Sequence, residues 1–234
     1  MNKPANLPSI DPKLHFNSAY LSLIKGSIGI LVNPEHTDSV FDIEDGLRQL
    51  AVTRELFNFT TQEPEVISLV RERYLKPVPN LNRLRNLPEG SLGRAYARHL
   101  DDNNFDPNYY RKIEVRNDTD YILMRIRQTH DIWHVVTGFD TDALGEIAIK
   151  GVELSQTHRP MAAVICAGGI FRYMLKQPAE FGKCIEAIAA GYSLGLKARP
   201  LLGVKWEEMW DRQLDELRAS LKISPFLASK YKIN

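Results

Sequence analysis

The sequence has few cysteines and no excess of charge of one sign. Its 234 residues include two cysteines, Cys166 and Cys184, and its 30 basic side chains are nearly balanced by 29 acidic ones. Without CxxC spacing or further cysteines, these two predict small core residues in a reducing compartment rather than a disulfide framework or a cysteine metal site. The net charge of +1 gives no electrostatic reason to expect nucleic acid as a partner.

Long apolar runs are also absent. The most apolar window, residues 161–170, is soon followed by Arg172, and it is well short of the ~18 apolar residues that a membrane-spanning helix requires. Residues 1–15 have neither the apolar run of a signal peptide nor the arginine-rich pattern of a transit peptide. We therefore expect these first residues to be poorly ordered, and the protein to be cytoplasmic or peripheral on the cytoplasmic face of a membrane.

Helical periodicity runs through most of the chain, because apolar residues recur at intervals of three and four and alternating segments are scarce. We predict an all-α fold in which residues 1–234 form a single domain resembling a helical bundle. The predicted helices cover 17–31, 38–50, 64–75, 118–137 with Asp118 as candidate cap, 142–157, 160–176, 179–198 and 205–221. Residues 76–93, with three prolines and two glycines, predict a loop or short turns.

Residues 130–146, HDIWHVVTGFDTDALGE, bring together two histidines, an aspartate between them and a glutamate farther on. On a helix, His130 and His134 lie four residues apart and Asp131 and His134 lie three apart, so the three side chains can converge. Imidazole nitrogens and carboxylate oxygens in such a group suit Zn²⁺, with Fe²⁺, Mn²⁺ or Mg²⁺ as alternatives. The stretch therefore predicts part of a divalent metal site.

A further ligand is expected from the next helix. Gly138 ends the first helix, and the polar turn 139–142 reverses the chain. A helix pair joined by so short a turn is antiparallel, which carries Glu146 back alongside His134, and Gly145 would let the helices approach closely. The ligands predicted for this helix–turn–helix metal site are His130, Asp131, His134 and Glu146.

Each of these side chains also has an ordinary structural interpretation, and the residues alone leave both open. A His-x₃-His pair often arises by chance, Asp131 can be a solvated helix residue, and Glu146 can form a surface pair with Lys150. The main apolar stripe of helix 142–157 lies nearly opposite Glu146, which favours the surface pair.

Two other metal chemistries use similar motifs. Helical phosphohydrolases with a His-Asp doublet need an upstream histidine, for which His99 or His15 is available, but His99 is expected near the carbonyls at the end of a helix. A peptidase of the His-Glu-x₂-His type would need Asp131 as its base, and aspartate reaches a metal-bound water less well than glutamate does. The phosphohydrolase stays as an alternative, and the peptidase is the weaker of the two.

The segments around the motif are as informative as the motif itself. They read SLGRAYARHL, VRNDTDYILMRIRQTHD, GEIAIKGVE, RPMAAV and LGVKWEEMWDRQLDELRASLKI. With the central form His-Asp-x₂-His-x₁₁-Glu, the chain resembles the coenzyme Q biosynthesis protein four family, strongly over about 88–222 and by pattern over 16–87. Since no mitochondrial presequence is present, it resembles a bacterial member.

The resemblance implies a helical protein of ubiquinone biosynthesis that binds a divalent metal, usually zinc, through His130, Asp131, His134 and Glu146. Family members replace the C1 carboxyl of a polyprenylated head group by a hydroxyl, an oxidative decarboxylation in which the same four residues would act. They also organise the other quinone-biosynthesis proteins on the membrane surface. A non-catalytic, lipid-binding scaffold is therefore the alternative to an enzyme.

The implied ligand is a polyprenylated aromatic or other isoprenoid lipid, which needs an apolar groove. The small-residue helices 161–175 and 185–196 are candidates to line it, with tight helix packing as the structural alternative. Three basic side chains near the motif could pair with a carboxylate or phosphate of the ligand, or could lie on solvated helix faces. They are Arg125, Arg127 and Lys150. The aromatic-rich segment 205–221 suits contact with a partner or with a second copy in a homodimer.

Overall fold

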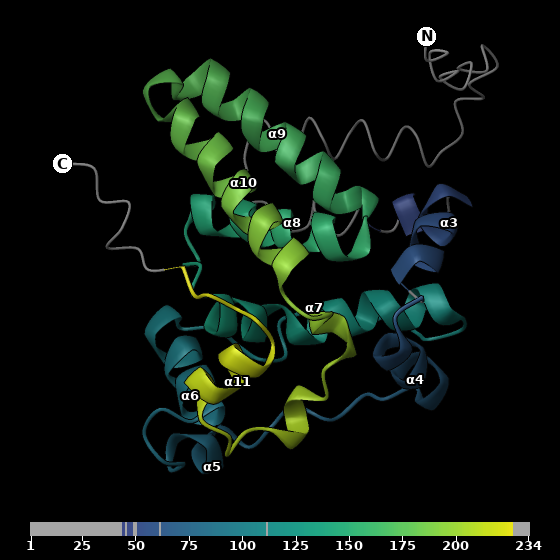
Figure 1. Ribbon diagram of the computed structural model, residues 1–234, viewed down its shortest axis with the longest axis vertical. Helices are drawn as coiled ribbons and strands as arrows, with labels where there is room; N and C mark the ends of the chain where they lie inside the picture. Colours follow the sequence, from purple (N-terminus) through teal and green to yellow (C-terminus); the bar gives the residue numbers. More distant parts are fainter. Residues whose placement is uncertain (1–43, 45, 49–50, 61, 111, 227–234) are drawn as a thin grey trace, which may run out of the picture.

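The computed structural model describes residues 44, 46–48, 51–60, 62–110 and 112–226, which build helices joined by short connections (Figure 1). The α-helices among them are α3 (Ala51–Thr60), α4 (Pro64–Glu72), α5 (Leu81–Arg85), α6 (Leu92–Asn103), α7 (Asp118–Thr137), α8 (Ala143–Thr157), α9 (Pro160–Lys176), α10 (Phe181–Lys197) and α11 (Leu214–Ser220). The 3-10 turns are η1 (Pro178–Glu180), η2 (Leu201–Gly203) and η3 (Trp206–Glu208). This part of the chain has no strand beyond an isolated bridge, which confirms the all-α prediction.

Several predictions fall outside the described residues. These are the poor order of residues 1–15, the helix 17–31 and most of the helix 38–50. The helices predicted over 64–75, 142–157, 160–176 and 179–198 are confirmed to within about a turn by α4, α8, α9 and α10. The segment 76–93 is largely irregular, as predicted, but it includes the short helix α5, which the Asn80 side chain caps by accepting from the Arg83 N–H at 3.1 Å.

Helix α7 crosses the middle of the molecule, with α8, α9 and α10 on one side and α4, α6 and α11 on the other (Figure 1). Its ends follow from local residues. The Asn117 side chain accepts from the Asp120 N–H at 2.9 Å, and Gly138 has a left-handed φ of 76°. The cap is therefore one residue before the predicted Asp118, and the predicted stop at Gly138 is confirmed.

Helix α8 lies between α7 and the pair formed by α9 and α10 (Figure 1). It approaches α10 closely, because a Cβ atom at Gly191 would lie 1.9 Å from the Ala148 carbonyl oxygen. On another side of α8, Ile147 packs against Gly169 of α9. A Cβ atom added to Gly169 would lie 2.7 Å from Ile147 Cδ1. The predicted close packing of small residues is thus found, and α8 has neighbours on several faces rather than one buried stripe.

The continuous helix predicted over 205–221 is wrong. The structure has η3 and the separate helix α11 instead. Between them the backbone bonds to the start of α6, where the Gly93 N–H donates to the Trp210 carbonyl at 2.8 Å. Since Trp206 and Trp210 are buried in the main core, these aromatic side chains are not available for the contact between copies that the sequence suggested.

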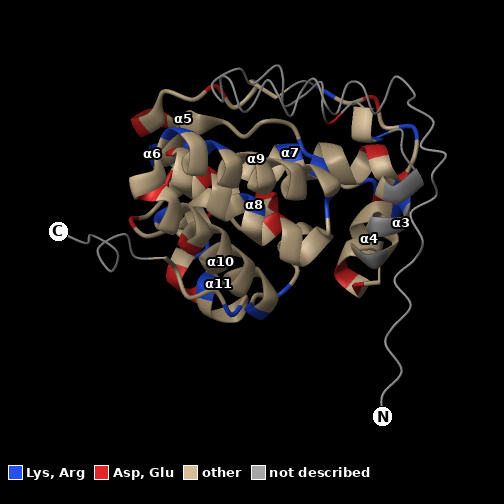
Figure 2. Cartoon of the chain, turned by 90° about the horizontal axis from the view of Figure 1, so that it is seen from above, with Lys and Arg blue, Asp and Glu red and all other residues tan. Residues whose placement is uncertain are grey.

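Charged residues are interspersed over the described helices rather than gathered on one face (Figure 2). Two of them are buried against expectation. Arg125 pairs with Glu207 at 2.5 Å and donates to the Val204 carbonyl at 2.7 Å, and Arg127 pairs with Glu44. Because both arginines are buried, their interpretation as parts of solvated helix faces is wrong. The ion pairs and hydrogen bonds are the partners that a buried charge requires.

Candidate metal centre

The candidate site lies where α7 and α8 meet across a tight turn. The Asp142 side chain caps α8 by accepting from the Gly145 N–H at 2.7 Å. A Cβ atom at Gly145 would lie 1.9 Å from the Asp140 carbonyl oxygen, so only glycine fits inside this turn. Gly145 was expected to let the two helices approach, and the structure shows that it serves the turn itself. The turn returns the chain so that Glu146 faces the end of α7.

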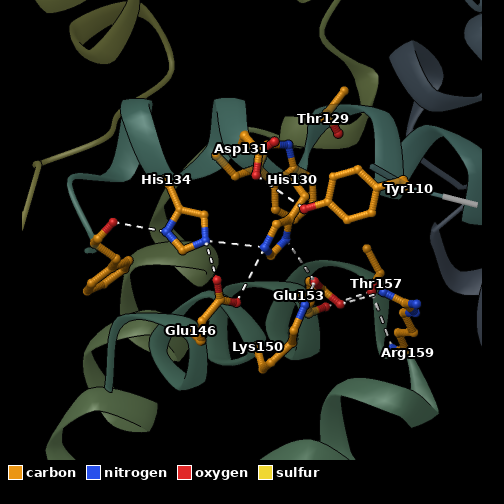
Figure 3. A network of polar contacts seen from close by, with 12 residues as sticks. Tyr110, Thr129, His130, Asp131, His134, Glu146, Lys150, Glu153, Thr157 and Arg159 are labelled. Carbon is orange, nitrogen blue, oxygen red and sulfur yellow. Dashed lines mark hydrogen bonds and ion pairs between the residues drawn. The ribbon is translucent and has the colours of Figure 1, made fainter. Parts of the chain in front are cut away.

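Three side chains converge at this point, as Figure 3 shows. His130 Nε2 lies 3.3 Å from Glu146 Oε2, and His134 Nε2 lies 3.3 Å from Glu146 Oε1. The two Nε2 atoms are themselves 3.3 Å apart. Choosing one ligand atom from each residue gives a group whose atoms all lie within 4.8 Å of one another. The spacing predicted from the sequence is thus realised for these three residues.

The orientation of His134 is fixed by the turn. Its Nδ1 lies 3.0 Å from the Phe139 carbonyl oxygen, and since a carbonyl can only accept, Nδ1 carries a proton that it donates there. In the neutral ring Nε2 is then left with a lone pair directed at Glu146. A metal-ligating imidazole is commonly held in this way by a backbone carbonyl on its other nitrogen.

Asp131 takes a different position from the other three predicted residues. It is buried, so its interpretation as a solvated helix residue is wrong, and it does not belong to the group of convergent ligand atoms among the described residues. The Tyr110 hydroxyl donates to Asp131 Oδ1 at 3.2 Å, and the Tyr110 ring packs edge-on against His130 (Figure 3). Burial raises the pKa of Tyr110 well above its ordinary value, and the Asp131 charge adds to this, so the phenol keeps its proton.

The charges of the metal-free site are coupled. Burial alone would raise the pKa of Glu146, but the neighbouring His130 and His134 lower it well below its ordinary value. For His134, burial lowers the pKa and the hydrogen bond and charge of Glu146 raise it by more. Glu146 therefore stays ionised between the two imidazoles. Its side chain is 40% exposed, so the site opens to solvent on the Glu146 side.

Glu153, two turns beyond Glu146 on α8, is a site residue that the sequence reasoning missed. It is fully buried, and it pairs with Lys150 Nζ at 2.5 Å and with Arg159 at 2.8 Å. The surface pair between Glu146 and Lys150 that the spacing allowed is therefore not formed. Burial would raise the pKa of Glu153, but the charges of Lys150 and Arg159, with a smaller contribution from His130, lower it to about 2.

His99 is the upstream histidine that the phosphohydrolase alternative required. The prediction that it lies at the end of a helix is wrong, because α6 continues to Asn103. Its ring stacks on His134 with centroids 5.8 Å apart, and its Nε2 is buried without a hydrogen-bond partner. It does not join the convergent group of ligand atoms among the described residues, and it serves as a packing neighbour of His134.

The whole site fits the donor preferences of a divalent transition metal. Two imidazole nitrogens and a carboxylate oxygen form a set that binds Zn²⁺ and Fe²⁺ and leaves further coordination positions for other ligands.

Among the residues that the structure describes, no helix combines the length and apolar character needed to cross a membrane.

Comparison with known proteins bears on the whole chain. The family model described as coenzyme Q (ubiquinone) biosynthesis protein Coq4 matches residues 12–226. The mitochondrial ubiquinone biosynthesis protein coq4 of Talaromyces stipitatus is 31% identical, covering 94% of this chain and 77% of its own. The COQ4 homolog of Danio rerio is 30% identical, covering 92% of this chain and 80% of its own. A crystal structure of a Nostoc punctiforme protein assigned to ubiquinone biosynthesis has a TM-score of 0.78 and 36% identity, covering 86% of this chain and 97% of that one.

Proposed function

Because the chain belongs to the coenzyme Q (ubiquinone) biosynthesis protein Coq4 family, we propose that it acts on the aromatic head group of a polyprenylated hydroxybenzoate and replaces the C1 carboxyl by a hydroxyl. The observation that carries the proposal is the convergence of His130, His134 and Glu146, whose ligand atoms lie within 4.8 Å of one another. The same family membership favours quinone biosynthesis over the phosphohydrolase alternative.

The geometry supports a bound divalent metal, with zinc as the first candidate. With bond lengths of about 2.0–2.1 Å, two nitrogen ligands on a tetrahedral zinc are about 3.3 Å apart. The distance between the two Nε2 atoms is 3.3 Å, and each lies 3.3 Å from a Glu146 oxygen. His130, His134 and Glu146 would therefore hold the ion, and Asp131, which lies outside this group and accepts from Tyr110, is proposed as an acid–base group.

The proposed reaction breaks the bond between the ring carbon C1 and its carboxyl and forms a carbon–oxygen bond in its place. In net terms, the aryl carboxylate, dioxygen, water and one proton give the phenol, carbon dioxide and hydrogen peroxide, so dioxygen is the two-electron oxidant. The metal supplies Lewis acidity toward the carboxylate or the phenol oxygen of the substrate. Tyr110 Oη holds a proton toward Asp131 Oδ1, which makes this pair the proposed proton relay.

The prenyl tail needs apolar surface, and helices α9 and α10 expose it. Their exposed apolar side chains are Phe171, Met174, Leu175, Ile185, Tyr192 and Leu196. The small residues of α10 pack on α8, as the contact between Gly191 and Ala148 illustrates. The exposed side chains of this hairpin therefore support the proposed contact with an isoprenoid lipid and with a membrane surface, on the cytoplasmic side in a bacterial cell.

The same exposed side chains favour a second candidate, a non-catalytic scaffold that binds lipid and other quinone-biosynthesis proteins. The two candidates differ in what they do to the substrate. The test is to add a prenylated 4-hydroxybenzoate carrying ¹³C in its carboxyl group to the metal-loaded protein in air. An enzyme releases ¹³CO₂ and yields the hydroxylated ring in equal amount, and this release is lost in His134→Ala. Binding of the lipid without release of label would establish the scaffold and overturn the enzyme.

A further inference from the structure

Glu153 is a buried charge on α8, and besides its ion pairs with Lys150 and Arg159 it also faces His130. Its carboxylate is fully buried, although the first turn of the same helix face carries the partly exposed Glu146. The two glutamates are seven residues apart, which is two helical turns, so both side chains project toward α7. Figure 3 shows that they lie on either side of His130.

The two nitrogens of His130 face these two glutamates separately. Its Nε2 lies 3.3 Å from Glu146 Oε2, and its Nδ1 lies 3.9 Å from Glu153 Oε1. A distance of 3.9 Å is too long for a hydrogen bond but within reach of an attraction between a fixed negative charge and an N–H dipole. His130 thus has a counterpart to the Phe139 carbonyl that holds the Nδ1 of His134.

We propose that Glu153 is a positioning residue, whose carboxylate favours the proton on His130 Nδ1 and thereby leaves the Nε2 lone pair for the metal. The role rests on the metal site of the proposed function. A carboxylate behind a metal-bound histidine fixes the tautomer and raises the basicity of the ligand. Lys150 holds Oε1, the Glu153 oxygen that faces His130, and Arg159 pairs with the other oxygen, Oε2. Among the described residues, neither basic side chain forms an ion pair with His130, His134 or Glu146.

The test compares Glu153→Gln with Arg159→Gln. The Arg159 variant breaks ion pairs of the same buried network, to Glu153 Oε2 and to Glu44. It leaves Lys150 to hold Oε1, the carboxylate oxygen behind His130. Zinc affinity is measured by competition with a chromophoric chelator, and the Nδ1 proton of His130 is observed by ¹H–¹⁵N NMR of the zinc-loaded protein. We expect Glu153→Gln to lower the affinity about 10–100-fold, as losses of such outer partners do, and to shift the Nδ1 proton.

Arg159→Gln is expected to lower the unfolding temperature while changing zinc affinity less than about threefold, far below the effect of removing a carboxylate behind a ligand. Equal losses of affinity in the two variants, or an unchanged Nδ1 proton in Glu153→Gln, would assign Glu153 to the fold alone. If Glu153→Gln does not fold, Glu153→Asp keeps the charge and withdraws it by one methylene, and unchanged affinity and Nδ1 shift there would overturn the role. A wild type without zinc affinity would instead overturn the proposed metal site, and this role with it.

Discussion

At the scale of single residues, Glu146 is the side chain on which both histidines depend. It lies 3.3 Å from each Nε2 atom, so its carboxylate is the negative charge that the two imidazoles share. The i,i+4 spacing of the histidines was readable from the sequence, since a helix places such residues on one face. Glu146 was harder to assign, because the apolar stripe of α8 lies nearly opposite to it and suggested that Glu146 faces solvent. The stripe misled because α8 packs against neighbours on several faces, and one of them is α7.

Glu146→Gln keeps the shape of the side chain and removes its charge, and we expect it to lower metal affinity by more than about 100-fold, because loss of an outer partner alone costs 10–100-fold. The measurement is metal content after dialysis together with competition against a chelator. Glu186→Gln, at an exposed position of α10, is the matched control and should behave as wild type. Full metal content in Glu146→Gln would remove Glu146 from the ligand set.

The metal-free protein should depend on pH through the same residues. The raised pKa of His134 gives a contribution to stability that is complete below its ordinary pKa of 6.5 and is lost as pH rises through the folded value. The lowered pKa of Glu146 gives a second contribution to stability. This contribution is complete above the ordinary pKa of 4.5 and is lost as pH falls through the pKa of the folded protein. The pair therefore stabilises the fold most between pH 4.5 and 6.5.

This window is tested by thermal unfolding of chelator-treated wild type and Glu146→Gln. Their difference in unfolding temperature should be largest near about pH 5.5 and should shrink as pH rises through the raised pKa of His134. A difference that does not change with pH would show that His134 and Glu146 do not form a charged pair.

Tyr110 and Glu153 show why part of the site was not predicted. Tyr110 comes from the irregular segment between α6 and α7, whose path no periodicity describes. Glu153 did carry a signal, its seven-residue spacing from Glu146, but that spacing gains meaning only once α8 is known to face α7 on that side. The convergence of His130, His134 and Glu146 was predictable from one helix and one turn, and the residues that contact them from elsewhere required the tertiary fold.

At the scale of helices, local signals predicted the elements whose ends are set by their own residues. Helices α7, α8 and α9 begin beside an asparagine, aspartate or proline and were placed within a residue or two. The segment 205–221 misled, because its apolar spacing suits a helix while its backbone is bonded to α6. That bonding is a tertiary contact with no local signature in the segment.

The crossing of α8 and α10 gives a prediction at the same scale. Gly191→Ala would place a Cβ atom 1.9 Å from the Ala148 carbonyl oxygen, so α10 must move away, and we expect a loss of about 2 kcal/mol or more in the free energy of unfolding. Gly182→Ala, on the same helix with nothing within 4 Å of the added atom, is the control and should gain up to about 1 kcal/mol from helix propensity. Urea unfolding measures both, and equal stability of the two variants would show that the helices do not meet so closely.

At the scale of the whole molecule, two pairs of helices have different features. Helices α7 and α8 hold the candidate metal site, and the hairpin of α9 and α10 exposes apolar side chains. Leu175 and Leu196 are the most exposed of them, at 71% and 64%, and they lie toward opposite ends of the hairpin. Most of the exposed large apolar side chains among the described residues lie on these two helices, and exposed apolar surface often marks an interaction site, so this hairpin is the first candidate for the proposed contact with a lipid or a membrane.

The double variant Leu175→Glu and Leu196→Glu should therefore fold as wild type, because neither side chain is buried. Its binding to phospholipid vesicles that contain a prenylated 4-hydroxybenzoate should fall at least about tenfold. The reason is that the burial of two leucines contributes about 3 kcal/mol or more. Co-sedimentation measures the binding, and circular dichroism checks the fold. Val78→Glu, at an exposed apolar position outside the hairpin, controls for added negative charge. Metal affinity should not change in either variant, because the substitutions lie outside the cluster around Glu146. Vesicle binding by the double variant at the wild-type level would move the membrane contact away from α9 and α10.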